Sequence, residues 1–286
     1  MQKEWWKMKT KIILNYIIGF VISILICLTA LFLIMKLSIF DKSYIISFLD
    51  KENYYDKVFR EIQEEMENDI MPSGFTNDII KDTFTKEEVK NDIIIFINNM
   101  YEGKETSLNK EELKNHIQEN INSFLKKSNL SITDQDGLNN FIDDLVNVYK
   151  NEVCLYSYAN SFINIFFRIS KIINKVVIGL SILLVILFIL SKKLLNFAYL
   201  SSSIFASGLI ILFIRMFIFE RIDAENLLII TENFSNIVTI IINNIGTYLY
   251  YIGIGLIVFG IILSCKVFLK NVNYAIKENK ILQKNG

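Results

Sequence analysis

Few side chains of this sequence belong to the types that carry catalysis or bind metals, and their spacing argues against both roles. His116 is the only histidine, and an imidazole is the side chain best suited to acid–base chemistry near neutral pH. One histidine cannot build a multi-histidine metal site, and as a general base it would need an oriented partner. The three cysteines, at positions 27, 154 and 265, match no zinc-site spacing. The sequence therefore predicts no catalytic residue, no metal and no cofactor.

The segment 134–137, with the sequence Asp-Gln-Asp-Gly, resembles part of a calcium loop. An EF-hand loop needs oxygen ligands at positions 1, 3 and 5 and a glycine at position 6. With Gly137 at position 6, Ile132 would stand at position 1, where it offers no ligand. We therefore expect these residues to form a turn that leads into a helix N-terminus.

Arg215 is the one candidate functional residue that the sequence singles out. It is the only charged residue in an apolar run that extends from residue 204 to residue 219, and an ionisable residue inside a membrane segment indicates function by default. It also lies near the end of that segment, where a long side chain can reach the interface, and Glu220 or an acidic residue of the polar domain could pair with it. Structural anchoring and a functional role both remain open.

The chain lacks the sequence motifs of the common enzyme classes. No Gly-rich phosphate loop, His-Glu-x-x-His helix, Gly-x-Ser-x-Gly elbow or Cys-x-x-Cys pair occurs. No segment assigned to the cytoplasm is large enough for a kinase or nucleotide-binding domain. The basic tails are short and border apolar segments, so we expect no nucleic-acid partner.

Four apolar segments of membrane length dominate the sequence. The chain is 52% hydrophobic, its mean hydropathy is +0.37, and a bilayer core of about 30 Å is crossed by about 20 helical residues. Each segment must be a helix, because lipid offers the backbone no hydrogen-bond partners. The sequence predicts an all-α protein, a bundle of four transmembrane helices with an extracytoplasmic helical domain inserted between the first and the second.

The distribution of Lys and Arg predicts the orientation of these helices. Lysines flank the first helix on its N-terminal side, fill the turn between the second and third helices, and follow the fourth. Residues 41–152 hold 24 of the 30 acidic and 13 of the 30 basic residues, a formal charge of −11. The predicted segments are a cytoplasmic basic tail (1–11), transmembrane helix 1 (12–35), the extracytoplasmic acidic domain (36–171), transmembrane helices 2 (172–191) and 3 (194–217), an extracytoplasmic loop with an amphipathic helix (218–245), transmembrane helix 4 (246–265), and a second cytoplasmic basic tail (266–286).

Apolar residues recur at helical spacing throughout the acidic domain and predict four main helices. The stripes start at Tyr55, Val89, Leu113 and Leu138. We expect these residue pairs to cap helix N-termini: Thr85 with Glu88, Asn109 with Glu112, and Thr133 with Asp136.

Small residues form rows on the predicted first and fourth membrane helices. Such residues let helix backbones approach closely. Packing within the bundle and a dimer interface are the two interpretations, and the first is favoured. The rows are Gly19, Ser23, Cys27 and Ala30 in the first helix, and Gly246, Gly253 and Gly260 in the fourth.

The first half of the acidic domain carries a resemblance to a known group. Its segments are 54–59 (YYDKVF), 71–75 (MPSGF), 84–93 (FTKEEVKNDI) and 97–104 (INNMYEGK). They resemble a group of uncharacterised four-helix integral membrane proteins from clostridia and related low-GC Gram-positive bacteria, which implies a location rather than an activity. The layout is also similar to that of the lipoprotein intramolecular transacylases, but the region 156–162 lacks the histidine of their motif.

These observations predict a cell-membrane protein that is not an enzyme, a surface sensor or an accessory subunit. Besides the lipid bilayer, the expected partners are a membrane protein, or a basic peptide or cation attracted by the −11 domain; the alternative is that its acidity only solvates the domain. A second hypothesis is a membrane-embedded enzyme acting on lipid or cell-envelope substrates. A deep polar pocket lined by several of Arg215, Glu220 and Tyr156 would favour the enzyme.

Overall fold

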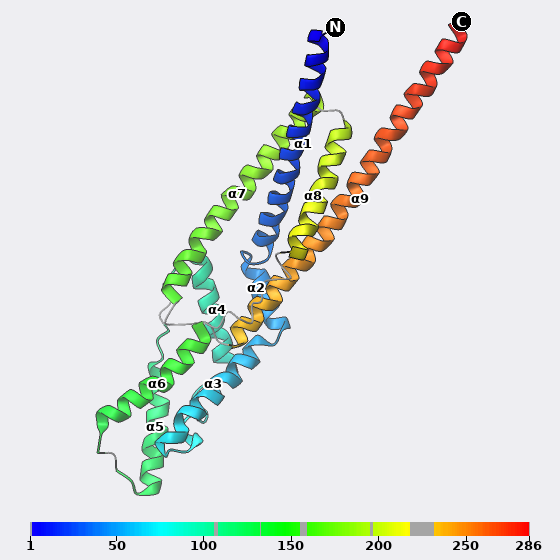
Figure 1. The fold of residues 1–286 in the computed structure, drawn as a ribbon. Coiled ribbons are helices and arrows are strands. Elements are labelled where there is room, and N and C mark those ends of the chain that lie inside the picture. Colours follow the sequence, from blue (N-terminus) through cyan, green and yellow to red (C-terminus); the bar gives the residue numbers. More distant parts are fainter. Residues whose placement is uncertain are drawn as a thin grey trace. The chain divides into compact units, whose positions relative to one another are not determined.

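The computed structural model describes residues 2–105, 108–131, 133–154, 159–194, 197–217 and 232–285. Every regular element in these residues is a helix (Figure 1), which confirms the predicted helical class for this part of the chain. The elements are α1 (Gln2–Leu37), α2 (Lys42–Lys51), α3 (Tyr54–Ile70), the 3-10 helices η1 (Met71–Ser73) and η2 (Asn77–Ile79), α4 (Lys86–Glu102), α5 (Glu111–Ser128), α6 (Gln135–Cys154), α7 (Ala159–Leu194), α8 (Phe197–Phe217) and α9 (Glu232–Asn285).

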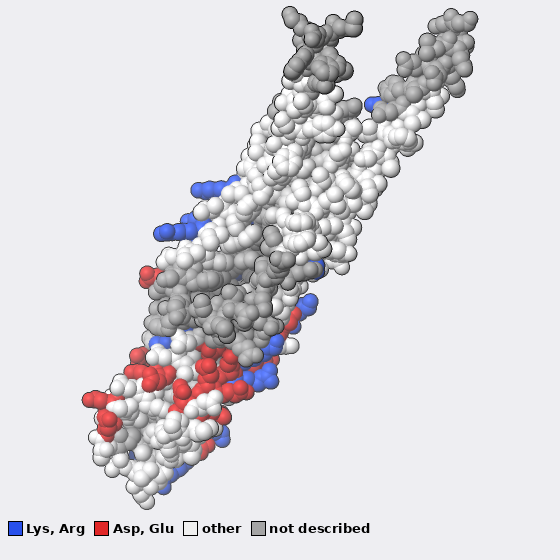
Figure 2. All heavy atoms as spheres, in the orientation of Figure 1, with Lys and Arg blue, Asp and Glu red and all other residues white. Residues whose placement is uncertain are grey.

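The chain forms two compact units. The membrane unit consists of Met1–Ser38, Ile172–Asp223 and Thr239–Gly286, and the acidic unit consists of Ile39–Lys171 and Ala224–Val238. Helix α7 continues from the acidic unit into the membrane unit without a break. Figure 2 shows Asp and Glu side chains gathered on the visible face of the acidic unit, whereas the visible membrane helices display mostly uncharged side chains.

Within the described residues, four helices are long and apolar enough to cross a bilayer. The number agrees with the prediction from the sequence and supports a multi-pass membrane protein. These spans are Ile12–Leu37 in α1, Ile163–Ile189 in α7, Ala198–Phe217 in α8 and Val238–Lys270 in α9.

Helices α1 and α8 of the membrane unit pack at a row of small residues. A Cβ atom added to Gly19 would lie only 2.9 Å from the Oγ atom of Ser203. The Ser23 hydroxyl donates a hydrogen bond of 2.9 Å to the carbonyl oxygen of Ser203. In lipid, such contacts replace the hydrophobic effect, because the tails around the helices are as apolar as the helices themselves.

Helices α8 and α9 approach each other just as closely. A Cβ atom on Gly208 would lie 2.7 Å from the carbonyl oxygen of Gly253, and one on Gly260 would lie 2.8 Å from the backbone nitrogen of Phe205. The predicted rows of small residues therefore serve packing within the bundle at these positions.

The acidic unit has a core of its own, formed by α3, α4, α5 and α6. The apolar stripes predicted from the sequence face this core, because helical spacing places one residue of every three or four on the same side. The fully buried side chains of these helices include Ile62, Met66, Ile70, Val89, Ile117, Ile121, Ile142, Leu145 and Tyr149.

The helix starts of the acidic unit confirm one predicted cap and correct two. The Thr85 hydroxyl accepts a hydrogen bond from the Glu88 backbone, and the Glu88 carboxylate accepts one from the Thr85 backbone. At α5 the cap is Lys110, and Asn109 instead accepts a bond from the Glu111 backbone. At α6 the side chain of Asp134, rather than Thr133, accepts a bond of 2.8 Å from the Gly137 backbone. Thr133 and Asp134 are adjacent short polar residues, so the spacing alone does not determine which one caps α6; at α5 the helix begins one residue later than predicted.

Two further differences concern whole elements. The short helix α2 has no counterpart among the predicted stripes; the Asp41 side chain accepts a hydrogen bond of 3.0 Å from the Tyr44 backbone and starts it. The predicted amphipathic helix and fourth membrane helix are not separated at Gly246, since α9 runs unbroken from Glu232 to Asn285. A single glycine inside a helix is tolerated, and α9 contains no proline. Residues 218–231 of the predicted loop lie outside the described residues.

Candidate functional site

Arg215 lies in the last turn of α8 and is half-buried. Its guanidinium carbon is 6.0 Å from the centre of the Tyr250 ring of α9, within the range of a cation–π contact. This geometry agrees with anchoring of α8 against α9. Glu220, the partner proposed from the sequence, lies outside the described residues, as does Tyr156.

The other residues weighed for chemistry lie at the surface or at a helix start. His116 is exposed on α5, and Asp134 caps α6 as part of the predicted turn. Within the described residues, no group of three or more His, Cys, Asp or Glu side chains is arranged to hold a metal ion.

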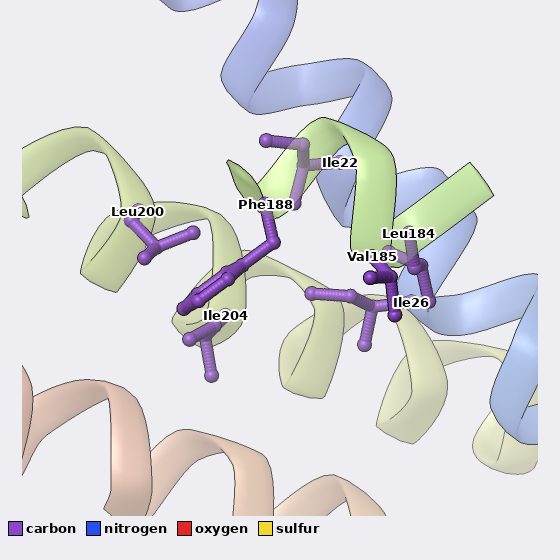
Figure 3. Close-up of a pocket in the computed structure, with 7 residues that line it drawn as sticks. All are labelled: Ile22, Ile26, Leu184, Val185, Phe188, Leu200 and Ile204. Atoms are coloured by element: carbon purple, nitrogen blue, oxygen red, sulfur yellow. The ribbon is translucent and has the colours of Figure 1, made fainter. Parts of the chain in front are cut away.

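A cavity of about 280 Å³ in the membrane unit is lined only by apolar side chains. Figure 3 shows Phe188 of α7 pointing towards Leu200 and Ile204 of α8. Ile22 and Ile26 of α1 and two further residues of α7 complete the lining. Because these side chains carry no polar atom, the cavity cannot position a proton, a nucleophile or a charged substrate.

Three neighbouring glutamate side chains lie in the acidic unit. We call Glu152, Glu61 and Glu65 the acid ladder. Glu152 is on α6 and is only 5% exposed. Glu61, half-buried, and Glu65, exposed, lie one turn apart on α3. The ladder thus extends from the core of the unit to its surface.

The innermost step of the ladder is a carboxyl–carboxyl contact. The Glu61 side chain acts on the Glu152 carboxyl group both through its charge and as a hydrogen-bonding neighbour, and both effects raise the pKa of Glu152. An ionised carboxylate only accepts hydrogen bonds, so a hydrogen bond between two carboxyl groups requires a proton on one of them. The Oε2 atom of Glu152 is also buried, with no hydrogen-bond partner among the described residues. Burying an ionised carboxylate oxygen without a hydrogen-bond partner costs free energy, so a carboxyl group in such a place usually takes up a proton and becomes neutral.

The electrostatic surroundings act in the same direction. Burial, followed by the charges of Glu61 and Glu65, raises the pKa of Glu152 to about 8. Burial and the charges of Glu61 and Asp69 also raise the pKa of Glu65. Burial, followed by the nearby acidic groups, raises the pKa of the Tyr54 hydroxyl. Burial and the neighbouring acidic groups therefore favour the protonated form of the Glu152 carboxyl group.

A second, partly buried polar cluster in the same unit pairs its negative charge with a positive one. The ammonium group of Lys110 forms an ion pair with Asp92, and the Tyr149 hydroxyl donates a hydrogen bond of 2.6 Å to the same carboxylate. Lys110 also lies 4.7 Å from the centre of the Tyr149 ring. Nearby, burial and the charge of Asp92 raise the pKa of the Cys154 thiol to about 12, so this cysteine is not a reactive nucleophile. The cluster holds α4, α5 and α6 together.

An aromatic cluster joins the two ends of the acidic unit, where the chain arrives from α1 and continues into α7. The ring of Phe40 stacks on that of Phe166 with centres 5.0 Å apart, and Tyr101 packs edge-on against Phe166 at 5.0 Å. The Tyr101 hydroxyl donates a hydrogen bond to the carbonyl oxygen of Ile39. We call Phe40, Tyr101 and Phe166 the aromatic clasp. It ties the end of α4 to the first turns of α7.

The acid ladder was not found from the sequence, although a signal for it exists. Glu152 continues the apolar stripe of α6, three residues after Tyr149 and seven after Leu145. A carboxylate in that register is predicted to face the core. The stripe does not reveal which residue of another helix lies opposite Glu152, and in the structure that residue is a second glutamate, Glu61.

The comparisons with known proteins place no relative beside this chain: no protein family model, no curated protein and no solved structure matches it.

Proposed function

We propose that this multi-pass membrane protein is a non-enzymatic surface sensor or accessory subunit whose acidic unit binds cations or basic peptides. The proposal places both termini in the cytoplasm and the acidic unit outside the cell membrane. The lysine-rich segments support this orientation, because Lys and Arg are enriched on the cytoplasmic side of membrane helices.

The observation that carries the proposal is the charge on the C-terminal half of α3. Glu64, Glu65, Glu67 and Asp69 are all exposed there, and the last turn holds no basic residue. The C-terminus of a helix carries a partial negative charge, so acidic residues at this end are unfavourable for the helix itself. Among the described residues, no ion pair neutralises these four side chains. These four acidic side chains do not stabilise α3, and their uncompensated negative charge attracts cationic ligands.

The connection between the units supports a sensor or accessory role. Helix α7 belongs to both units and is continuous. Its first turns are held by the aromatic clasp within the acidic unit. A ligand that changes the packing of the acidic unit therefore acts on a helix that enters the membrane unit.

The experiment compares two variants of the full-length protein, purified in mild detergent, for binding of a fluorescently labelled oligolysine peptide. The test variant is E64Q/E67Q/D69N, which removes three charges from α3 and leaves the acid ladder intact. The control is E105Q/E119Q/D144N, which removes three exposed charges elsewhere on the acidic unit. We expect the test variant to bind about tenfold more weakly, a loss of about 1.4 kcal/mol, and the control to bind nearly as the natural protein does.

Two outcomes would contradict the proposal. Absence of binding to the natural protein at low salt would remove the cationic ligand. Equal weakening in both variants would show that only the summed charge acts, with no binding surface on α3.

A further inference from the structure

The apolar cavity of the membrane unit is open on the side of α7, and we call it the α7 groove. Its wall on α8, formed by Leu200 and Ile204, is buried, with exposed fractions of 7% and 9%. On α7, by contrast, Val185 is 58% exposed and Phe188 is 43% exposed, although both line the same space (Figure 3). All the lining residues belong to membrane spans. The molecules that can enter the groove are therefore those of the bilayer.

The lining and the length of the α7 groove fit part of an acyl chain. All seven lining side chains are hydrocarbon, so the groove offers no hydrogen bond to water or to a polar ligand. On each of the three helices the lining residues lie within four positions of one another, which is about 6 Å along a helix axis. A hydrocarbon chain that fills this volume of about 280 Å³ restores the dispersion contacts that an empty space would lose.

One end of the groove lies close to the membrane surface. Leu200 is two residues from the start of its membrane span, and Phe188 is one residue from the end of its own. Next to Leu200, Tyr199 packs edge-on against Tyr16 of α1, with ring centres 5.1 Å apart. Tyrosines are enriched at membrane–water interfaces, where the ring stays in apolar surroundings and the hydroxyl lies at the level of the headgroups. A phosphate group at this level can accept hydrogen bonds from these hydroxyls.

The same end of the membrane unit is rich in positive charge. Lys192 and Lys193 lie four and five residues beyond Phe188 on α7. On α9, exposed Lys266 comes two residues after Ser264, which is hydrogen bonded to α8. The sequences of α7 and α8 contain no Asp or Glu. Basic residues beside a space between membrane helices attract anionic lipid headgroups.

We propose that the α7 groove binds one acyl chain of an anionic phospholipid, whose phosphate lies at the level of Tyr16 and Tyr199. The lysines that follow the groove on α7 balance the charge of the headgroup. The proposal goes beyond cation binding by the acidic unit and does not depend on it, because the lipid site lies within the membrane unit.

The test is native mass spectrometry of the full-length protein, delipidated in mild detergent and titrated with phosphatidylglycerol or phosphatidylcholine of identical acyl chains. We expect one phosphatidylglycerol to bind about tenfold more tightly than phosphatidylcholine, because lysines near a lipid surface attract anionic headgroups. K192Q/K193Q should remove this preference. The control K171Q/K175Q removes two exposed lysines nearer the start of α7 and should keep it.

A second pair of variants tests the groove itself. V185W fills the groove from the exposed side of α7, whereas I186W places the same ring at the next position, which is also exposed but does not belong to the lining. We expect V185W to weaken binding of phosphatidylglycerol about tenfold, since the ring takes the place of the acyl chain, and I186W to leave it nearly unchanged. Both positions are exposed, so neither variant overpacks a buried core.

Two results would overturn the lipid site. One is equal affinity of the natural protein for the two lipids, and the other is an equal effect of the two variants in either pair. Binding of the labelled oligolysine peptide to V185W separates these results from the proposed function, because it should persist whether or not the lipid binds.

Discussion

At the scale of single residues, two carboxyl groups of the acidic unit, partly buried Asp92 and buried Glu152, show how the surroundings of a group decide its protonation. Asp92 has a lysine and a tyrosine hydroxyl as partners, so its negative charge is compensated and contributes to packing. Glu152 faces another carboxyl group and is deprived of water, so it keeps a proton that an exposed glutamate would lose. The difference lies in the neighbours and not in the residue type.

This difference predicts how stability depends on pH. An unfolded glutamate loses its proton near its ordinary pKa of about 4.3, whereas folded Glu152 loses it at about 8. Between these values the folded state binds a proton that the unfolded state lacks, so its stabilisation is fully present below about pH 4 and falls as the pH rises to about 8. Relative to E152Q, the natural protein should lose up to about 1.4 kcal/mol of stability for each pH unit in this window.

Thermal unfolding of both proteins in the same detergent measures this, as the difference in Tm at several pH values. The Tm of the natural protein should fall relative to that of E152Q up to about pH 8 and then stay level. Parallel Tm curves for the two proteins would contradict protonation of Glu152 in the folded state.

At the scale of elements, close packing of backbones organises the membrane unit. Its helices expose large apolar side chains to their surroundings along most of their length, so burial of apolar area cannot pair them in lipid. Steric fit decides instead, as where Gly208 and Gly253 meet between α8 and α9. Helix α9 offers a direct comparison, because Gly255 faces open space while Gly260 lies against α8.

We therefore predict opposite effects of one substitution at two positions of α9. In G255A the added methyl group meets nothing within 4 Å, and alanine favours the helix by up to about 1 kcal/mol, so the Tm should rise or stay unchanged. In G260A the methyl group would lie 2.8 Å from the backbone nitrogen of Phe205, and such overpacking costs about 1–3 kcal/mol. Thermal unfolding in detergent distinguishes the two, and an equal rise in Tm for both variants would refute close packing of α9 on α8.

At the scale of the whole molecule, two features support the proposed sensor or accessory role: the concentration of acidic residues in one unit, and the continuous helix α7 that belongs to both units. Almost all of the acidity belongs to one unit, although the chain as a whole has zero formal charge. The aromatic clasp ties α4 to the first turns of α7 inside that unit, and α7 then continues into the membrane unit.

The proposed orientation predicts which introduced cysteines a membrane-impermeant maleimide can reach. In a background with the three natural cysteines replaced by alanine, E119C on exposed α5 should be labelled in intact cells. K284C, in the basic C-terminal tail, should be labelled only after the membrane is opened, because positive segments stay in the cytoplasm. Labelling of K284C in intact cells would reverse the topology and, with it, the side on which the acidic unit acts.

Much of the fold could be predicted from the sequence because its signals are local. Runs such as residues 176–190 have no polar face, so they require a lipid environment. The stripe that begins at Tyr55 predicts a helix from spacing alone, and Thr85 with Glu88 predicts its own cap. Thr133 was wrong as a cap because the adjacent Asp134 accepts the backbone hydrogen bond instead, and at α5 the cap position falls on Lys110, one residue after the predicted Asn109.

The sequence by itself determined the four long apolar helices, the helical class of the described residues and the concentration of acidity in residues 41–152, since these depend on composition and on contacts within one turn. Only the tertiary structure brought Glu152 of α6 beside Glu61 of α3, two residues separated by 91 positions in the sequence. The pKa of a carboxyl group depends on the charges and the water within a few ångströms of it. Those neighbours come from other helices, and therefore the packing of α3 against α6, rather than any motif, creates the site.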